Sequence, residues 1–531
     1  MNASPPNRFG SGKSIARVED DALLRGKGRF SDNVAQQGQL YACFVRSPHA
    51  HASIGRVDVS AAAAMPGVAA VLTGAELVRA GVKPIPNSAD FKRADGGPTV
   101  TPPHHALAVD TVRFVGEAVA AVIAATPLEA RDAAERVDVD YVPLPAVVDT
   151  VAAAAPGAPK VVAAAEDNIA CEAHYGDPAA VVEAFARAAH VVALDITNQR
   201  VAACPLEPRS TLATFDAQSG RLTLRASCQT PTGLRDELCE SVLQIPKEQV
   251  RVVVDDVGGG FGMKTSLYPE DVVVAFAARK LGKPVRFTAE RMEEFLAASH
   301  GRDLSSRAEL ALDANGRVLA LRVASLANVG AYATPAGVVI QLMIGPWVAT
   351  SIYDIPLIDI GIKAVLTHTL PTGPYRGAGR PEAIHMIERL MDEAARKTGI
   401  DRAELRRRNM IRPEQMPYVN PMGKTYDSGR FAQVMDRALA LSRWHGFDDR
   451  AATSARRGRL RGQGMATFLE WTGADVFEET VEVTVNGDDT IEVFTAAQPM
   501  GQSLATTFTQ LVVDVFGVPG ESIRISFGDT D

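Results

Sequence analysis

The chain has 531 residues, which predicts about three or four domains at a typical size of roughly 100–200 residues each. Its hydrophobic fraction is 46% and its charged fraction 22%, which excludes a disordered, collagen-like or coiled-coil chain. Lys and Arg number 55 against 63 Asp and Glu, a net charge of −8. This acidic balance excludes the basic footprint of a nucleic-acid-binding protein.

The cysteines form no CxxC pair, at positions 43, 171, 204, 228 and 239. Such a sparse, odd set favours reduced thiols and argues against a four-cysteine zinc site or a closely spaced iron–sulfur cluster. Residues Met1–Ser14 show no apolar core of a secretory signal. The longest clean apolar run, Ala118–Ala125, is far shorter than the roughly 20 residues of a membrane-spanning helix. We therefore expect a cytoplasmic protein without a membrane span.

The N-terminal region predicts a loose tail over 1–20 followed by a compact α+β unit over 21–148. Apolar and alternating segments in this unit predict strands at 40–46, 68–72, 118–123 and 137–142, and a helix at 128–136. The last strand alternates polar and apolar residues, which is typical of an exposed edge.

A stretch rich in Ala, Pro and Gly, 152–165, predicts a linker into a second region over 149–447. That region predicts strands near 189–198, 211–215, 221–227 and 250–255, and helices at 231–243, 268–281, 381–398 and 430–442. In the 381–398 helix, apolar residues repeat at i, i+3 and i+4, and Gly399 ends it. Asp401 with Glu404 then predicts a capping box for the next helix.

The charged stretch 448–462 predicts another boundary, after which 463–531 forms a third unit. It predicts strands at 479–485 and 490–495 and a helix near 502–516. No repeat of the solenoid or propeller kind is evident.

Two glycine-rich segments suggest nucleotide binding, and neither fits. Gly10–Ser14 ends like a phosphate-binding loop, but that loop needs a glycine where Asn7 stands. Gly258–Gly262 follows a predicted strand, but a dinucleotide fingerprint needs glycine where Met263 stands. Such a turn can still cradle an anionic group with its backbone N–H groups. The alternative is a tight turn that merely packs a helix on the sheet.

Four motifs together resemble the xanthine oxidase family of molybdenum hydroxylases. Gly258–Lys264 (GGGFGMK) resembles the first cofactor-contact motif of that family, and Pro374–Arg380 (PYRGAGR) resembles its active-site loop. Gln229 matches a family glutamine close to the metal, and Met500–Gln502 resembles a second pterin-binding segment. The motifs stand in family order, and within the family the chain is most similar to the large subunit of carbon-monoxide-dehydrogenase-type enzymes.

This resemblance implies an α+β fold, with a hammerhead-like domain (21–148), a first molybdopterin-binding domain (149–447) and the beginning of a second one (463–531). It implies molybdenum held by the dithiolene of molybdopterin cytosine dinucleotide, with no side chain as metal ligand. His104, His105 and His300 are then hydrogen-bonding or loop residues. FAD and iron–sulfur clusters belong to separate medium and small subunits, in a dimer of heterotrimers.

The resemblance also implies roles for individual residues. Backbone groups of the glycine turn and side chains from the other motifs would hold the cofactor: Gln229, Gly259, Gly260, Phe261, Gly262, Arg376, Gly501 and Gln502. Tyr375 and Gly377 would line the substrate pocket. The plain alternatives are that Arg376 is an ordinary salt-bridge arginine and Gln502 a residue at a helix N-terminus.

Three departures from the family pattern limit the expected reaction. Gly377 replaces the cysteine that binds copper in carbon monoxide dehydrogenases, and Thr265 replaces the glutamate that orients purines. An aldehyde or an aromatic N-heterocycle remains as the expected substrate, hydroxylated with oxygen from water. The Gly-x-Gly-Glu motif of the family's general base is not in this sequence, so no catalytic residue is identified.

Since a positioned base contributes about 10²–10⁴-fold to a rate, we expect the isolated chain to be nearly inactive, as a truncated or split subunit would be. Three alternatives remain open. They are a carbon monoxide dehydrogenase large chain, a flavin or nicotinamide dehydrogenase that uses the glycine turn, and a non-catalytic fragment that retains docking surfaces.

Overall fold

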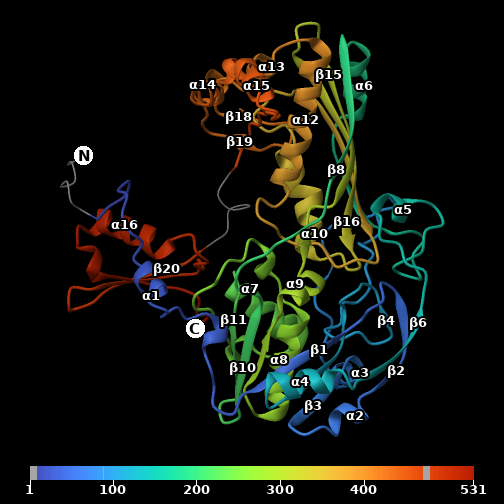
Figure 1. Cartoon of the computed structure of the whole chain (residues 1–531), viewed down its shortest axis with the longest axis vertical. Helices are drawn as coiled ribbons and strands as arrows, with labels where there is room; N and C mark the ends of the chain where they lie inside the picture. The colour runs from blue at the N-terminus through green and yellow to red at the C-terminus, as the bar shows by residue number, and fades with distance from the viewer. Residues whose placement is uncertain (1–8, 88, 471–478) are drawn as a thin grey trace.

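The computed structural model describes residues 9–87, 89–470 and 479–531. These residues form an α+β fold in which helices pack on several separate sheets (Figure 1). A seven-stranded sheet lies in the lower part of the view, a five-stranded sheet in the upper part, and the C-terminal segment at one side (Figure 1). The predicted fold class is confirmed.

The seven-stranded sheet combines strands from both sides of the expected domain boundary at 148. Its order is β12 (Val250–Val253), β11 (Arg221–Ala226), β10 (Ser210–Asp216), β13 (Val285–Thr288), β1 (Leu40–Arg46), β5 (Ala118–Ala124) and β3 (Val68–Thr73). β1 joins the two groups, because it pairs parallel with β13 and antiparallel with β5. The hammerhead region and the region after it therefore share one sheet.

The apolar strand β5 is buried at every residue, as expected of a strand covered on both faces. Helix α4 (Pro127–Ala134) packs on β1 and β5, and α8 (Pro269–Leu281) packs on β10 and β13. α8 begins with Pro269 at its first turn and ends at Gly282, whose φ of 60° suits a glycine. The predicted helix 231–243 is α7 (Pro231–Asp236) continued by a π-helical turn, Glu237–Leu243.

The five-stranded sheet has the order β7 (Ile169–Gly176), β17 (Ile358–Leu366), β16 (Val318–Gly330), β15 (Leu304–Leu312) and β8 (His190–Asn198). Helix α12 (Arg380–Thr398) lies against β8 and β15. It buries the predicted apolar stripe and ends at Gly399 with φ 72°. In the following helix, α13 (Arg402–Asn409), Asp401 caps the first turn, but Glu404 pairs with Arg407 and Arg408 instead of completing a capping box.

The other strands form small sheets. They are β4 (Thr111–Val112), β2 (Ala52–Asp58) and β6 (Asp138–Pro143); β14 (His300–Gly301) and β9 (Val201–Ala202); and β18 (Tyr418–Val419) and β19 (Thr425–Tyr426). β6 lies at an edge and is largely exposed, as its alternation predicts.

The remaining helices are short or peripheral. They are α1 (Asp20–Leu24), α2 (Ser60–Ala63), α3 (Gly74–Arg79), α5 (Thr150–Ala154), α6 (Pro178–Ala186), α9 (Arg291–Ala297), α10 (Pro335–Val339), α11 (Gly345–Trp347), α14 (Phe431–Ser442) and α15 (Phe447–Ala455). Two of them overlap stretches expected to separate domains. The expected linker 152–165 begins inside α5, and residues 448–455 of the expected boundary 448–462 lie in α15. Among the described helices, none is both long and apolar enough to cross a membrane.

The C-terminal segment forms a small sheet, β20 (Val481–Val485), β21 (Ile491–Thr495) and β22 (Ile523–Ser526), with helix α16 (Leu504–Phe516) beside it. The segment contacts the N-terminal residues. The Gln510 side chain donates to the carbonyl of Gly10 at 2.8 Å, and the Val18 N–H donates to Thr506 at 2.9 Å. The described part of the expected tail is therefore held against α16.

Candidate cofactor-binding site

Two neighbouring parallel strands bring Gln229 to the glycine turn. β11 and β12 run parallel in register, so the residues that follow them leave the sheet at the same edge. There the Gly262 N–H donates to Gln229 Oε1 at 2.8 Å, and the Gln229 N–H donates to the Lys264 carbonyl at 2.8 Å. Two of the four motifs thus meet directly.

The turn leaves no room for side chains at its glycines. A Cβ on Gly260 would lie 2.3 Å from Gln229 Oε1, and one on Gly262 would lie 2.8 Å from the Pro374 backbone. Gly259 and Gly262 have φ of 89° and 95°, and Phe261 between them has φ 55°. A left-handed backbone costs a non-glycine residue roughly 1–2 kcal/mol. The surroundings therefore hold the turn in a conformation that it would not adopt alone.

The active-site loop joins the turn through its backbone. The Arg376 N–H donates to the Phe261 carbonyl at 2.9 Å, and the Arg376 guanidinium lies 6.0 Å from the centre of the Phe261 ring. Behind the loop, the Arg302 side chain donates to the carbonyls of Arg376 (2.7 Å) and Tyr375 (3.3 Å). Gln229, the glycine turn and Arg376 therefore form one cluster.

Tyr375 and Gly377 lie in the same loop, but their contacts are with the protein framework. The Tyr375 side chain packs against a small apolar cluster that includes Met263 and Tyr268. A Cβ on Gly301 would lie 2.4 Å from Tyr375 Cβ, so only glycine fits beneath it. Gly377 has φ 93°, and a Cβ there would lie 2.5 Å from Pro381. The substrate-pocket role of these two residues stays a prediction.

Gly501 and Gln502 lie on a separate segment before α16. The Gln502 side chain bonds within its own turn, to the Gln498 carbonyl (2.9 Å) and the Met500 N–H (2.5 Å). A hydrogen bond connects this segment to the strand end before the glycine turn: the Gln498 side chain donates to the Asp255 carbonyl at 3.0 Å. Both Gly501 and Gln502 are exposed. In the described residues, no hydrogen bond joins them directly to the Gln229 cluster.

Charged residues that the sequence motifs do not include contact the cluster. The Lys264 ammonium, fully buried, donates to Glu207 at its carboxylate (2.9 Å) and its carbonyl (2.8 Å). Burial lowers the pKa of Lys264, although Glu207 opposes this. Arg302 likewise contacts buried Glu382 at 3.4 Å. Lys264 could have been singled out as the cation that ends the glycine motif, whereas Glu207, far back in the chain, gave no spacing signal.

A second buried charge network supports the helix after the turn. Arg209 contacts Glu270 (2.9 Å) and Glu294 (2.8 Å), and its guanidinium stacks 3.9 Å from the centre of the Tyr268 ring. Burial opposes ionisation of Glu270, but Arg209 and Arg46 outweigh it and lower its pKa to about 2. The Tyr268 hydroxyl donates to the Met263 carbonyl at 2.6 Å, so this network reaches the C-terminal side of the turn.

The three histidines considered as possible metal ligands, His104, His105 and His300, have different surroundings. His104 is buried and stacks on Tyr332 with ring centres 4.2 Å apart, and burial lowers its pKa to about 4. Burial lowers the pKa of His300 to about 4 as well, and that of His105 to a smaller extent. In the part of the chain that the structure describes, no group of three or more His, Cys, Asp or Glu side chains could hold a metal ion.

The free donors of the cluster suit an anionic group. Gln229 uses its Oε1 within the chain, which leaves its NH₂ group to donate outward. The N–H groups of Gly260 and Phe261 have no recorded acceptor among the described residues, and the Arg376 side chain is exposed. The Gly262 N–H, in contrast, already donates to Gln229, so its contact with the cofactor stays a prediction. The cradle without Cβ atoms and these donors fit an oxo or dithiolene-bearing cofactor.

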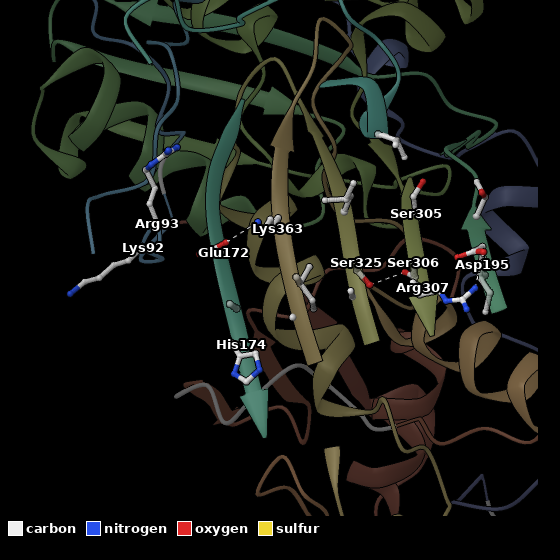
Figure 2. A pocket seen from close by; sticks show the side chains of 18 residues that line it. Lys92, Arg93, Glu172, His174, Asp195, Ser305, Ser306, Arg307, Ser325 and Lys363 are labelled. Carbon is white, nitrogen blue, oxygen red and sulfur yellow. Dashed lines mark hydrogen bonds and ion pairs between the residues drawn. The ribbon is translucent and has the colours of Figure 1, made fainter. Parts of the chain in front are cut away.

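A large cavity of the described structure lies away from this cluster. It is a groove of about 890 Å³ on one face of the five-stranded sheet, with small residues such as Ala324 and Gly361 among its lining (Figure 2). Two ion pairs lie among its lining residues, Arg307 with Asp195 at 2.9 Å and Lys363 with Glu172 at 3.9 Å (Figure 2). It contains no residue of the four motifs, so size alone does not mark the cofactor site.

Comparison with known proteins identifies the domains of the chain. Residues 161–410 and 437–531 each match the family model "Molybdopterin cofactor-binding domain". Residues 25–145 match "Aldehyde oxidase and xanthine dehydrogenase, a/b hammerhead domain". The glycine turn and the active-site loop both lie within the first of these matches.

Three relatives illustrate the likeness. The nicotine 6-hydroxylase large subunit of Paenarthrobacter nicotinovorans is 34% identical over 99% of this chain and 65% of its own length. The carbon monoxide dehydrogenase large chain of Afipia carboxidovorans is 33% identical over 98% of this chain and 67% of its own. The crystal structure of quinoline 2-oxidoreductase from Pseudomonas putida 86 superimposes with a TM-score of 0.92 at 32% identity, covering 99% of this chain and 67% of that one.

The fold and the family matches are those of a molybdopterin-binding oxidoreductase. The chain belongs to the xanthine oxidase family of molybdenum hydroxylases, as a large subunit. It spans about two thirds of the length of these curated relatives.

Proposed function

We propose that this chain is the molybdopterin-binding part of a hydroxylase that oxidises an aldehyde or an aromatic N-heterocycle. The observation that carries the proposal is the junction of Gln229, the glycine turn and Arg376. The relatives named for nicotine and quinoline, which are N-heterocycles, support this substrate class.

The residues of this chain would bind and orient the cofactor. Gly260 and Phe261 would donate backbone N–H groups, the Gln229 NH₂ would donate to an oxygen of the bound group, and Arg376 would supply fixed positive charge. When bound, the molybdenum cofactor supplies the redox chemistry of hydroxylation. Gly501 and Gln502 would contact the pterin only after the 498–503 turn rearranges, because Gln502 bonds internally. We propose the cytosine dinucleotide form of the cofactor.

Among the described residues, the carboxylates that contact these loops are paired with cations. Glu207 is engaged by Lys264, Glu382 by Arg302 and Glu470 by Arg380. Burial raises the pKa of Glu382, and its carboxylate contacts Arg302. We therefore propose that the 531-residue chain alone does not turn over substrate, and that the base comes from outside the described residues.

The electrons of the reaction need a route out. We propose an iron–sulfur small subunit and an FAD-binding medium subunit as partners, in a dimer of heterotrimers. The printed names of relatives, a "large subunit", a "large chain" and a "complex subunit gamma", support such a multi-subunit assembly. The free cysteines fit a reducing compartment, so we place the enzyme in the cytoplasm.

Carbon monoxide oxidation is the second candidate, favoured by the related dehydrogenases. The geometry of Gly377 argues against it. Its positive φ and the contact of an added Cβ with Pro381 leave no place for a thiolate, the ligand that Cu(I) prefers.

Purification of the chain from cells that make molybdenum cofactor tests the proposal. We expect about one molybdopterin per chain, detected by the fluorescence of its oxidised form. We expect dye reduction with an N-heterocycle or aldehyde only when the partner subunits and the segment that supplies the base are also present. A preparation with bound flavin and no pterin would contradict it.

A further inference from the structure

Both ends of the glycine turn converge on a single carboxylate. Glu207 Oε2 accepts the N–H of Gly258 at 2.8 Å, at the start of the turn. The same oxygen accepts the ammonium of Lys264 at 2.9 Å, at its end. It also accepts the Ser227 hydroxyl at 2.6 Å, two residues before Gln229. One side chain therefore ties together the three segments that build the cluster.

The burial of the ion pair between Lys264 and Glu207 is not explained by a contribution to stability alone. The Lys264 side chain is 0% exposed and that of Glu207 is 11% exposed. Burying an ion pair costs so much desolvation that apolar residues of similar volume often serve stability equally well. What an apolar pair cannot supply is directional bonds at fixed positions, and Lys264 makes two of these to Glu207.

The position of Lys264 fixes that of Gln229 through hydrogen bonds. The Lys264 carbonyl accepts the Gln229 N–H, and two residues earlier the Gly262 N–H donates to Gln229 Oε1. Because Oε1 is held by an N–H donor, the amide cannot flip without losing that bond, and its NH₂ group faces away from the turn. The ion pair thus anchors the backbone that sets the orientation of the amide.

We propose that Lys264, through Glu207, is a positioning residue that holds the glycine turn and keeps the Gln229 amide with its NH₂ group toward the bound cofactor. The identity of the ligand rests on the proposed function, whereas the positioning itself concerns the chain without ligand. The rival explanation is that the pair contributes only to overall stability.

Arg406 offers a matched control. Its side chain is also 0% exposed, and it pairs with buried Glu388 at 2.8 Å between α12 and α13. Its contacts include no residue of the turn. Lys264→Met and Arg406→Met each remove a fully buried cation and leave a buried carboxylate, so both lower stability. Only the first removes contacts to the turn.

Hydrogen–deuterium exchange on the full chain, prepared without cofactor, measures the turn directly. We expect Lys264→Met to raise the exchange rate of the peptide spanning 258–265 by about tenfold, since local opening governs protection. Arg406→Met should leave that peptide close to the wild-type rate. The double variant Lys264→Met with Glu207→Gln removes both charges, and should regain thermal stability while the turn still exchanges fast.

Protection of the turn in Lys264→Met at the wild-type level, or its return in the double variant, would overturn the positioning role. If Lys264→Met does not fold, Glu207→Gln is measured in the same assay, because this variant keeps a hydrogen-bond acceptor and removes only the negative charge. Faster exchange of the 258–265 peptide would support the positioning role, and exchange at the wild-type rate would overturn it. Molybdopterin content is measured in parallel. Wild-type chain without pterin would refute the proposed function but not the exchange result, whereas pterin in wild type and its loss in Lys264→Met would support both.

Discussion

Substitution of Gly260 by alanine tests the junction of the turn with Gln229 by adding a single carbon. The new Cβ would lie 2.3 Å from Oε1, 2.5 Å from Cδ and 2.7 Å from Cγ of Gln229. No rotation of alanine relieves this contact, so the Gln229 side chain must move away and lose its bond from Gly262. Gly260 has no positive φ, and the effect is therefore steric alone.

The magnitude follows from two contributions. Overpacking of a filled site costs typically about 1–3 kcal/mol, and the lost hydrogen bond costs about 0.5–1.5 kcal/mol. We expect a loss of about 2–4 kcal/mol in local stability, seen as a fall in Tm of several degrees. For the function, displacement of a positioned group by about 1 Å can cost on the order of 10²-fold in rate.

Thermal scanning fluorimetry and pterin content give the two readouts. Gly487→Ala is the control, because a Cβ there meets nothing within 4 Å and the residue has no positive φ. We expect the control to match wild type in both readouts, while Gly260→Ala loses Tm and most of its pterin. Wild-type Tm and pterin content in Gly260→Ala would show that Gln229 does not lie where the structure places it.

Three further predictions follow from single residues. Gly377→Cys should bind no stoichiometric copper in the assembled enzyme, because φ 93° and Pro381 exclude a side chain there; metal analysis showing one copper per molybdenum would contradict this. Phe261→Gly should raise Tm slightly, since relief of a left-handed φ contributes roughly 1–2 kcal/mol and the ring is already 41% exposed; a clear fall in Tm would refute the reasoning. Burial lowers the pKa of His104 from 6.5 to about 4, so its contribution to stability is present above pH 6.5 and is lost as the pH falls toward 4. His104→Phe keeps the stack on Tyr332 and should make Tm fall less steeply over this range; equal slopes would exclude His104 as a source of the acid sensitivity.

Helices and strands with a clear local sequence pattern could be predicted from the sequence. The α12 helix has an apolar stripe at helical spacing and Gly399 at its end, and the buried run of β5 reads as a strand. The five-stranded sheet was mostly missed, because only β8 was predicted among its strands. Strand β16 mixes Arg322, Ser325 and Asn328 with apolar residues. Its strand state depends on pairing with β15 and β17, which no local pattern reveals.

The residues of the site could be predicted from sequence motifs, but the contacts between them could not. Resemblance indicated Gln229, the glycine turn and Arg376, and the structure joins them. The bond from Gly262 to Gln229 could not be foreseen, because it depends on β11 and β12 being parallel neighbours. The same holds for Glu207, which reaches the turn only through the fold. Long-range contacts of this kind leave no periodicity in the sequence.

A common principle connects the charges behind the site. Lys264 bonds Glu207, Arg302 bonds the carbonyls of the active-site loop, and Arg209 stacks on Tyr268, whose hydroxyl bonds the Met263 carbonyl. Each cation thus fixes backbone from behind the cluster. A turn with several positive φ angles needs such restraint, because its own conformational preference opposes it. None of these bonds uses the N–H groups of Gly260 and Phe261 or the NH₂ group of Gln229. These donors therefore remain available to an anionic ligand.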